Sequence, residues 1–266
     1  MSQNEKSTVK IAAIQLSVTD DKTKKERMRD VKSIFQEMES IEKKPDLILL
    51  PEIWGCGFFD FDHYTECAEE RKGETFQLLS TWAAKLQSVI VGGSIVEISG
   101  DTLFNSLLCI ERDGTLKATY RKRHLFGFQS KEQQILTKGE SAVVADTQFG
   151  KIGFSTCYDL RFPEHYREMI DQGAELFVVV SAWPEARLDH WRLFNQVRAV
   201  ENQCWLVSCN CAGLQCGNRY AGHSMAVSPS GVIAAEAGGK ACVQWIDLDM
   251  KEVERARNAF PALRDR

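Results

Sequence analysis

The sequence has little of what marks a membrane, nucleic-acid-binding or dinucleotide-binding protein. Its 266 residues contain no apolar run that approaches the ~20 residues of a membrane-spanning helix. The net charge is −4 and no basic block supplies phosphate contacts, which disfavours a nucleic-acid or membrane-surface partner. The pattern G-x-G-x-x-G is absent, so a dinucleotide-binding enzyme is disfavoured as well. We therefore expect no nucleic-acid partner and no membrane partner.

The cysteines and the N-terminus lack the features of an exported protein. Nine cysteines is an odd number, and the first ten residues are polar and contain no apolar signal core. We therefore expect a reducing, cytoplasmic location. Four cysteines lie close together in sequence, but they contain no C-x2-C pair, so small core residues are favoured over a metal site. These four are Cys204, Cys209, Cys211 and Cys216. Cys209 and Cys211 are two apart in an expected strand and should point to the same face.

Apolar runs alternate with segments of helical spacing along the chain, which is typical of an α/β protein. No linker or composition break divides the chain, so we expect one domain over residues 1–266. Strands are expected at residues 8–16, 46–50, 89–96 (broken by Gly92-Gly93), 103–110, 115–120, 142–146, 152–157, 175–181, 205–211 and 243–247, with a hairpin of residues 226–228 and 232–235. Helices are expected at residues 20–41 (capped by Asp20 or Asp21), 75–86, 163–172, 187–202 and 248–256, and a polar loop at residues 129–140.

The helix expected at residues 187–202 carries an apolar stripe. Trp191, Phe194, Val197 and Val200 recur at helical spacing, and we expect them to belong to the core. In the first β-α-β unit, the strands should be parallel neighbours, and ligands bind beyond the carboxyl ends of such strands. Residues that follow a strand are therefore candidates for a functional site.

Three residues with complementary chemistry follow expected strands. Glu52 comes directly after the strand at residues 46–50, Lys122 follows the one that ends at Tyr120, and Cys157 ends an apolar run. Backbone N–H groups of a strand-to-helix turn favour a thiolate and can stabilise an oxyanion. A carboxylate can take the thiol proton, and an ammonium would balance the charge. Such a site suits hydrolysis of an amide or nitrile through a thioester.

Each of these residues also has a simpler interpretation when it is considered alone. Cys157 could be a buried structural thiol, Glu52 could cap a helix or tie a loop, and Lys122 could belong to a solvated basic turn. The functional interpretation is favoured because all three occur together at strand ends.

The motifs around these residues resemble the nitrilase superfamily of carbon–nitrogen hydrolases. The Glu-Lys-Cys triad of that family matches Leu-Leu-Pro-Glu at residues 49–52, Tyr-Arg-Lys-Arg-His-Leu at residues 120–125 and Cys-Tyr-Asp-Leu-Arg-Phe at residues 157–162. The resemblance extends over nearly the whole chain, including residues 11–15, 199–203 and 221–224. It implies a four-layer α-β-β-α sandwich, an enzyme without cofactor or metal, and a homodimer or higher homo-oligomer that pairs through helices beside the active site.

The resemblance also implies roles for further residues. Glu132 would be a second glutamate that assists the triad, with Glu140 as the less favoured choice. Tyr158 would lend its backbone N–H to the oxyanion hole beside Lys122. Arg161 would either recognise a substrate carboxylate or, as the favoured alternative, form a structural salt bridge beneath the nucleophile. Trp183, in the segment Ser-Ala-Trp-Pro at residues 181–184, would contact substrate.

Within the superfamily, the chain looks most similar to the omega-amidase and Nit-type branch. Those enzymes hydrolyse the terminal amide of a dicarboxylic or α-keto acid monoamide to acid and ammonia, so a small amide is the implied substrate. Loops at residues 54–64 and 213–220 would shape specificity. An N-carbamoyl amine hydrolase, a deaminated glutathione amidase and a nitrilase stay open, although the Cys-Trp-Glu usual in nitrilases is absent. A catalytically silent binding protein is disfavoured because all three triad residues are present.

Overall fold

The computed structural model describes residues 8–266. Residues 1–7, on which most of the expectation about a signal core depends, lie outside the described residues. Two six-stranded sheets make up the body of the molecule. The first contains, in spatial order, β14 (Cys242–Asp249), β1 (Thr8–Gln15), β2 (Leu47–Leu49), β3 (Val89–Ser99), β4 (Thr102–Ile110) and β5 (Leu116–Arg121). The second contains β13 (Ile233–Glu236), β12 (Met225–Val227), β9 (Trp205–Asn210), β8 (Leu176–Ser181), β7 (Gly150–Thr156) and β6 (Val144–Thr147).

The central strands of both sheets are parallel. β1, β2 and β3 run parallel to one another, as do β7, β8 and β9, and the outer strands pair antiparallel. All six residues of β8 are buried, as expected for a parallel strand covered on both faces. The carboxyl ends of these parallel strands meet at one edge of each sheet, and the loops there carry the candidate site.

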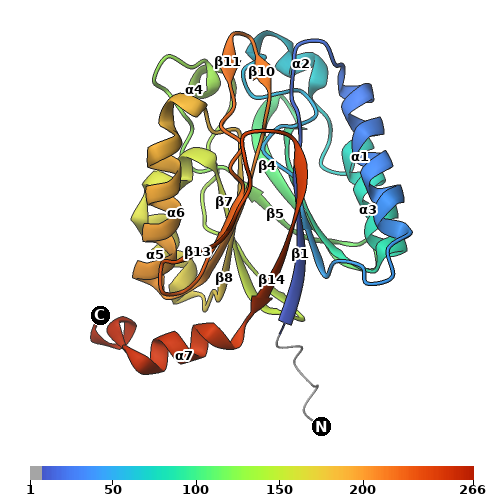
Figure 1. Ribbon diagram of the computed structural model, residues 1–266. Coiled ribbons are helices and arrows are strands. Elements are labelled where there is room, and N and C mark those ends of the chain that lie inside the picture. The colour runs from blue at the N-terminus through green and yellow to red at the C-terminus, as the bar shows by residue number, and fades with distance from the viewer. Residues whose placement is uncertain (1–7) are drawn as a thin grey trace.

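Helices cover the outer face of each sheet. α1 (Lys24–Glu39) and α3 (Glu74–Leu86) lie over the first sheet, and α5 (Pro163–Asp171) and α6 (Leu188–Asn202) lie over the second (Figure 1). The side chains of β2 pack on both faces of the first sheet. Ile48 packs toward the helices, while Leu47 and Leu49 face the space between the two sheets. The arrangement confirms the predicted α-β-β-α sandwich.

Near the candidate site, the structure differs from expectation at a glycine pair. β3 continues through Gly92-Gly93 instead of breaking, with a bulge between Val91 and Ser94. Gly93 has a positive φ of 68°, and a Cβ there would lie 1.9 Å from the Pro51 carbonyl oxygen. The glycine therefore lets β3 approach the residue that precedes Glu52.

Other boundaries also move, for local reasons. α1 is capped by Thr23 rather than by Asp20 or Asp21, because Thr23 and Glu26 form a capping box. β14 pairs with β1 up to Asp249, so the last helix, α7 (Lys251–Ala259), starts later than predicted. The loop at residues 129–140 contains a short helix, α4 (Glu132–Ile135).

The stripe on α6 is core only in part. Trp191 is buried, but Val200 is 44% exposed and Phe194 and Val197 are half-buried. The buried side of α6 is shifted by about one residue and includes Arg198, whose guanidinium donates to the Leu160 carbonyl. An apolar strip consequently faces outward from the second helical layer.

Short elements gather at the carboxyl ends of the sheets. α2 (Tyr64–Cys67), β10 (Leu214–Gln215) and β11 (Asn218–Arg219) lie together at the end of the molecule opposite α7 (Figure 1). Within residues 8–266, no helix combines the length and apolarity that crossing a membrane requires.

Candidate active site

The loops after β2 and β5 bring together three of the predicted site residues. Glu52, Lys122 and Glu132 are completely buried. The Lys122 ammonium donates to Glu52 Oε1 over 2.8 Å and to Glu132 Oε1 over 2.9 Å. Glu140, the other candidate for a second glutamate, is exposed. The structure therefore places one buried cation between two buried carboxylates.

Electrostatics hold Lys122 in its charged form. Burial alone would lower its pKa, but Glu132 and Glu52 more than offset this effect and raise the pKa above its usual range. The pKa of Glu132 is raised, chiefly by burial, against the opposing effect of Lys122. The Phe58 ring lies beside the ammonium, with its centre 5.1 Å from Nζ.

Asn105 joins this cluster, although sequence reasoning missed it. Its amide nitrogen donates to Glu52 Oε1 over 2.8 Å and to Glu132 Oε1 over 3.1 Å. Glu52 Oε2 remains, and it accepts the Ala182 N–H over 2.9 Å. A signal was available, because an asparagine in the middle of the apolar run of β4 requires buried partners.

Cys157 sits on a strained turn between β7 and the helical turn that follows. Its φ is 47°, which is unusual for a residue with a side chain. Burial and the nearby Glu52 raise the pKa of its thiol, while Lys122 acts in the opposite direction. The resting group is therefore a neutral thiol that needs a base. Ala182, whose N–H binds Glu52, lines the same cavity as Cys157, which places the carboxylate near the thiol.

Asp159, two residues after Cys157, ties the two halves of the site together and was not predicted. Its buried carboxylate accepts the Tyr120 hydroxyl (2.6 Å), the His124 N–H (2.9 Å) and the Thr156 N–H (3.0 Å). It also bonds the His124 ring at Nδ1 over 2.7 Å. Since Tyr120 and His124 flank Lys122, one carboxylate links the lysine segment to the cysteine turn.

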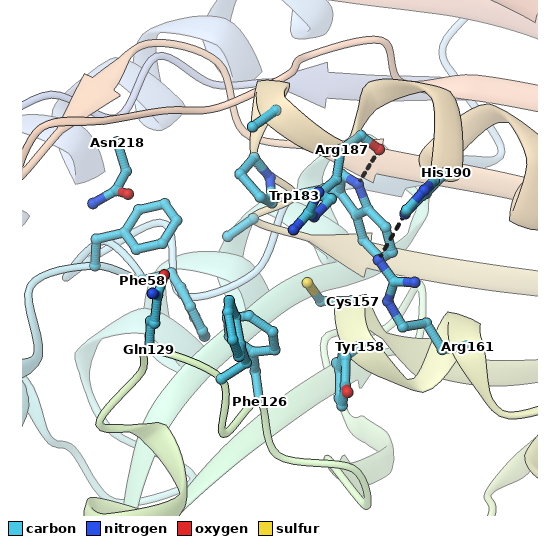
Figure 2. Close-up of a pocket in the computed structure, with 15 residues that line it drawn as sticks. Phe58, Phe126, Gln129, Cys157, Tyr158, Arg161, Trp183, Arg187, His190 and Asn218 are labelled. Atoms are coloured by element: carbon cyan, nitrogen blue, oxygen red, sulfur yellow. Dashed lines mark hydrogen bonds between the residues drawn. The ribbon is translucent and has the colours of Figure 1, made fainter.

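A cavity of about 580 Å³ opens above Cys157. In Figure 2 the sulfur of Cys157 points into it, with Phe58 and Gln129 on one side and Trp183, Arg187 and His190 on the other. The lining is aromatic on the side of the loop after β2 and cationic on the side of α6. Its residues are Phe58, Phe59, Phe126, Phe128, Gln129, Cys157, Tyr158, Arg161, Ala182, Trp183, Pro184, Ala186, Arg187, His190 and Asn218.

Arg161 lines this cavity, and the favoured prediction of a structural salt bridge beneath the nucleophile is wrong. Within residues 8–266, no carboxylate forms an ion pair with it. Its guanidinium lies 5.0 Å from the ring centres of both Trp183 and Phe194, and one nitrogen lies 3.3 Å from His190 Nδ1 (Figure 2). Aromatic stacking thus holds a cation whose charge is left for a ligand.

Tyr158 and Trp183, also predicted, both reach the cavity. The Tyr158 ring packs edge-on against Phe126. The Trp183 indole donates to the Arg187 carbonyl over 2.8 Å, and its backbone N–H donates to Asn210 Oδ1 over 2.7 Å. These contacts fix the wall of the cavity beside Arg161.

The predicted cysteine cluster lies apart from the cavity. Cys211 follows the end of β9 and does not share a face with Cys209: their thiols approach the Glu52 and Ile14 carbonyls respectively. In the part of the chain that the structure describes, no group of three or more His, Cys, Asp or Glu residues could hold a metal ion.

The two sheets and the buried site define the class of protein. The family model for carbon-nitrogen hydrolases matches residues 10–258, and the chain belongs to this family of hydrolases that act on carbon–nitrogen bonds. It is 34% identical over 264 residues to a 2-oxoglutaramate amidase of Paenarthrobacter nicotinovorans, covering 96% of this chain and 88% of that protein. It is 33% identical over 274 residues to omega-amidase NIT3 of Saccharomyces cerevisiae, covering 97% and 93%. The crystal structure of Saccharomyces cerevisiae Nit3, from branch 10 of the nitrilase superfamily, matches with a TM-score of 0.87 and 31% identity over 98% of this chain and 97% of that one.

Proposed function

We propose that the protein is an omega-amidase that hydrolyses the terminal amide of a dicarboxylic or α-keto acid monoamide to the acid and ammonia. One observation carries the proposal: Cys157 lines the same cavity as the guanidinium of Arg161, which has no carboxylate partner in the described residues. A linear monoamide presents an amide at one end and a carboxylate at the other. Its carboxylate would pair with Arg161 while its amide carbon reaches the thiol. Relatives at 33–34% identity that are named 2-oxoglutaramate amidase and omega-amidase support this substrate class.

The first half of the reaction forms a thioester. Glu52 takes the Cys157 thiol proton, the resulting thiolate attacks the amide carbon, and the carbonyl oxygen becomes an oxyanion. The Lys122 ammonium and the Tyr158 N–H stabilise this oxyanion. As the tetrahedral intermediate collapses, Glu52 returns the proton to the nitrogen, and the C–N bond breaks to release ammonia.

The second half uses the same base, with water as the nucleophile and the sulfur as the leaving group. Glu52 takes a proton from a water molecule as its oxygen attacks the thioester carbon. The C–S bond breaks, the acid leaves, and the proton on Glu52 returns to the sulfur. Glu132 assists by holding Lys122 from the opposite side, over 2.9 Å, so that the ammonium stays in place while Glu52 changes charge.

Ammonia release across a small panel tests the proposal. The panel contains succinamate, glutaramate, α-ketoglutaramate, an N-carbamoyl amine and a simple nitrile. Wild type should release ammonia from the three monoamides, and Cys157→Ala should not. Cys109→Ala removes a buried thiol between the sheets, away from the cavity, and should retain activity.

Each contrary result has a distinct meaning. Turnover confined to the carbamoyl compound or the nitrile would keep the nucleophile and replace the substrate class. Ammonia release that survives in Cys157→Ala would refute the nucleophile. A wild type inactive on the whole panel would favour the binding-protein alternative.

We further propose a cytoplasmic homodimer that pairs through α5 and α6. All nine cysteines are free thiols, which fits a reducing compartment. The outward apolar strip on α6, with Leu193 56% and Val200 44% exposed, supports pairing at this face.

A further inference from the structure

Ser181, the last residue of β8, has a side-chain hydroxyl that takes no part in the hydrogen bonds of the described fold. The residue is completely buried, and its Oγ has no hydrogen-bond partner among the described residues. Burying a hydroxyl without a partner costs free energy, so such groups are uncommon in folded proteins. The position of this one next to the reacting thiol suggests what it is for.

The strand register brings Ser181 to Cys157. β7 and β8 are parallel, and Thr156 pairs with Val180, so the next residue on each strand leaves the sheet beside the other. The register accordingly brings the Ser181 side chain next to Cys157. Cys157 and Ala182 line the cavity but Ser181 does not, so the hydroxyl approaches the sulfur from the protein side, away from substrate.

We propose that Ser181 is a hydrogen-bond donor reserved for the Cys157 thiolate. The inference rests on the proposed role of Cys157 as nucleophile. A neutral thiol is a weak acceptor, so the hydroxyl gains little from it in the resting enzyme. Once Glu52 has taken the proton, the sulfur is an anion and the hydroxyl donates a charge-assisted hydrogen bond to it. Because the bond forms only with the charged state, it favours attack without tightening substrate binding.

Within residues 8–266, no hydrogen bond of the resting fold uses this hydroxyl. The backbone oxygen of Ser181 accepts the Cys211 N–H over 3.0 Å, and that contact does not involve the side chain. The neighbouring thiol of Cys211 approaches the Glu52 carbonyl. Removal of the hydroxyl in Ser181→Ala therefore breaks no hydrogen bond of the resting fold, and the variant should unfold at or above the wild-type temperature.

The test measures the thiolate directly, without substrate. The rate at which iodoacetamide alkylates Cys157 is followed against pH by mass spectrometry of the peptide that contains it. In Ser181→Ala the midpoint of this profile should move upward by about 0.5–1 pH unit, because the thiolate has lost a donor. With an amide that the enzyme turns over, kcat should fall about 3- to 10-fold while KM stays within about 2-fold.

Two further variants make the result decisive. Ser208→Ala removes another buried hydroxyl, on β9, which points at the Met225 carbonyl 3.5 Å away, and should match wild type in both assays. Ser181→Cys keeps the size of the side chain with a weaker donor, and its midpoint should fall between wild type and Ser181→Ala; it also serves if Ser181→Ala does not fold.

An alkylation profile and kcat in Ser181→Ala that equal those of wild type would overturn the inference. If Cys157→Ala were still active, the proposed nucleophile would fail instead. The two failures are therefore distinguishable.

Discussion

At the scale of single residues, Arg161 is the cationic side chain of the cavity that we expect to bind the substrate carboxylate. A guanidinium held between two aromatic rings, without a carboxylate partner in the described chain, keeps its full charge for a ligand. His190, whose Nδ1 lies 3.3 Å away, fixes its direction. The preference of the enzyme for a substrate with a carboxylate over one with a neutral end should therefore depend on Arg161.

Arg161→Gln should raise KM for carboxylate-bearing monoamides by about 10- to 100-fold, since one charge-assisted pair contributes roughly 1.5–3 kcal/mol. Turnover of an uncharged amide of equal length should change little. Steady-state kinetics on the matched pair of amides measures both. Arg219→Gln is the control, because Arg219 is exposed, pairs with Glu185 and is not among the residues that line the cavity. An equal loss on the charged and the neutral amide would exclude carboxylate recognition by Arg161.

At the scale of elements, the site depends on how segments distant in sequence are joined. β5 brings Lys122 and β7 brings Cys157, and these belong to different sheets. Asp159 links them through Tyr120 and His124. It acts on the reaction through the residues that it positions, because its hydrogen bonds go to Tyr120, His124 and Thr156.

Asp159→Asn should lower kcat about 10- to 100-fold with a smaller change in KM, because an amide nitrogen would meet donors where the carboxylate accepts hydrogen bonds. It should also destabilise the fold at neutral pH by roughly 3 kcal/mol, as expected when a buried charged network is broken. The control is Asp146→Asn, at an exposed position. Kinetics and urea unfolding measure the two effects, and a variant with wild-type kcat would contradict the positioning role.

The pH dependence of this defect has a definite sign. Burial would raise the pKa of Asp159, but the hydrogen bond to His124, the nearby His165 and the hydrogen bonds from Tyr120 and Thr156 lower it below its usual value. A carboxyl whose pKa is depressed by folding contributes stability above its unfolded pKa of about 3.9, and the contribution disappears as the pH falls through the folded pKa. The stability difference between wild type and Asp159→Asn should thus shrink below about pH 4.

A site residue could be predicted from the sequence where its position depends on residues close to it in the chain. Glu52 and Cys157 could be placed at strand ends because apolar runs precede them in the chain. Asn105 could not be assigned partners, since its contacts come from residues 27 and 53 positions away. Asp159 has one local partner, Thr156, but its other partners lie 35 and 39 positions away. Gly93 was misjudged for the same reason: its positive φ serves contact with Pro51, in another strand's loop. Local pattern predicts elements well, whereas cross-segment hydrogen bonds require the fold.

For the whole molecule, the outer face of α6 is the feature that a single chain leaves unexplained. Leu193 and Val200 are exposed on one side of α6. Trp191, which follows His190, is buried on the other side of the same helix. α6 therefore connects the surface strip to the cavity wall that holds Arg161. Pairing of two copies at this face would bury the strip and fix the helix that carries His190.

We expect light scattering after size-exclusion chromatography to give twice the 30.1 kDa chain mass for wild type. Leu193→Glu combined with Val200→Lys should give the single-chain mass, because charges would replace the apolar strip. Ile98→Glu, which changes an exposed apolar residue on β3 instead, should leave the mass unchanged. If dimerisation also fixes α6, the double variant should raise KM for the monoamide more than it lowers kcat, since it loosens His190 and Arg161 and leaves Glu52 and Lys122 in place. A wild type at 30.1 kDa at all concentrations would exclude the dimer, and a monomeric double variant with unchanged KM would separate assembly from the site.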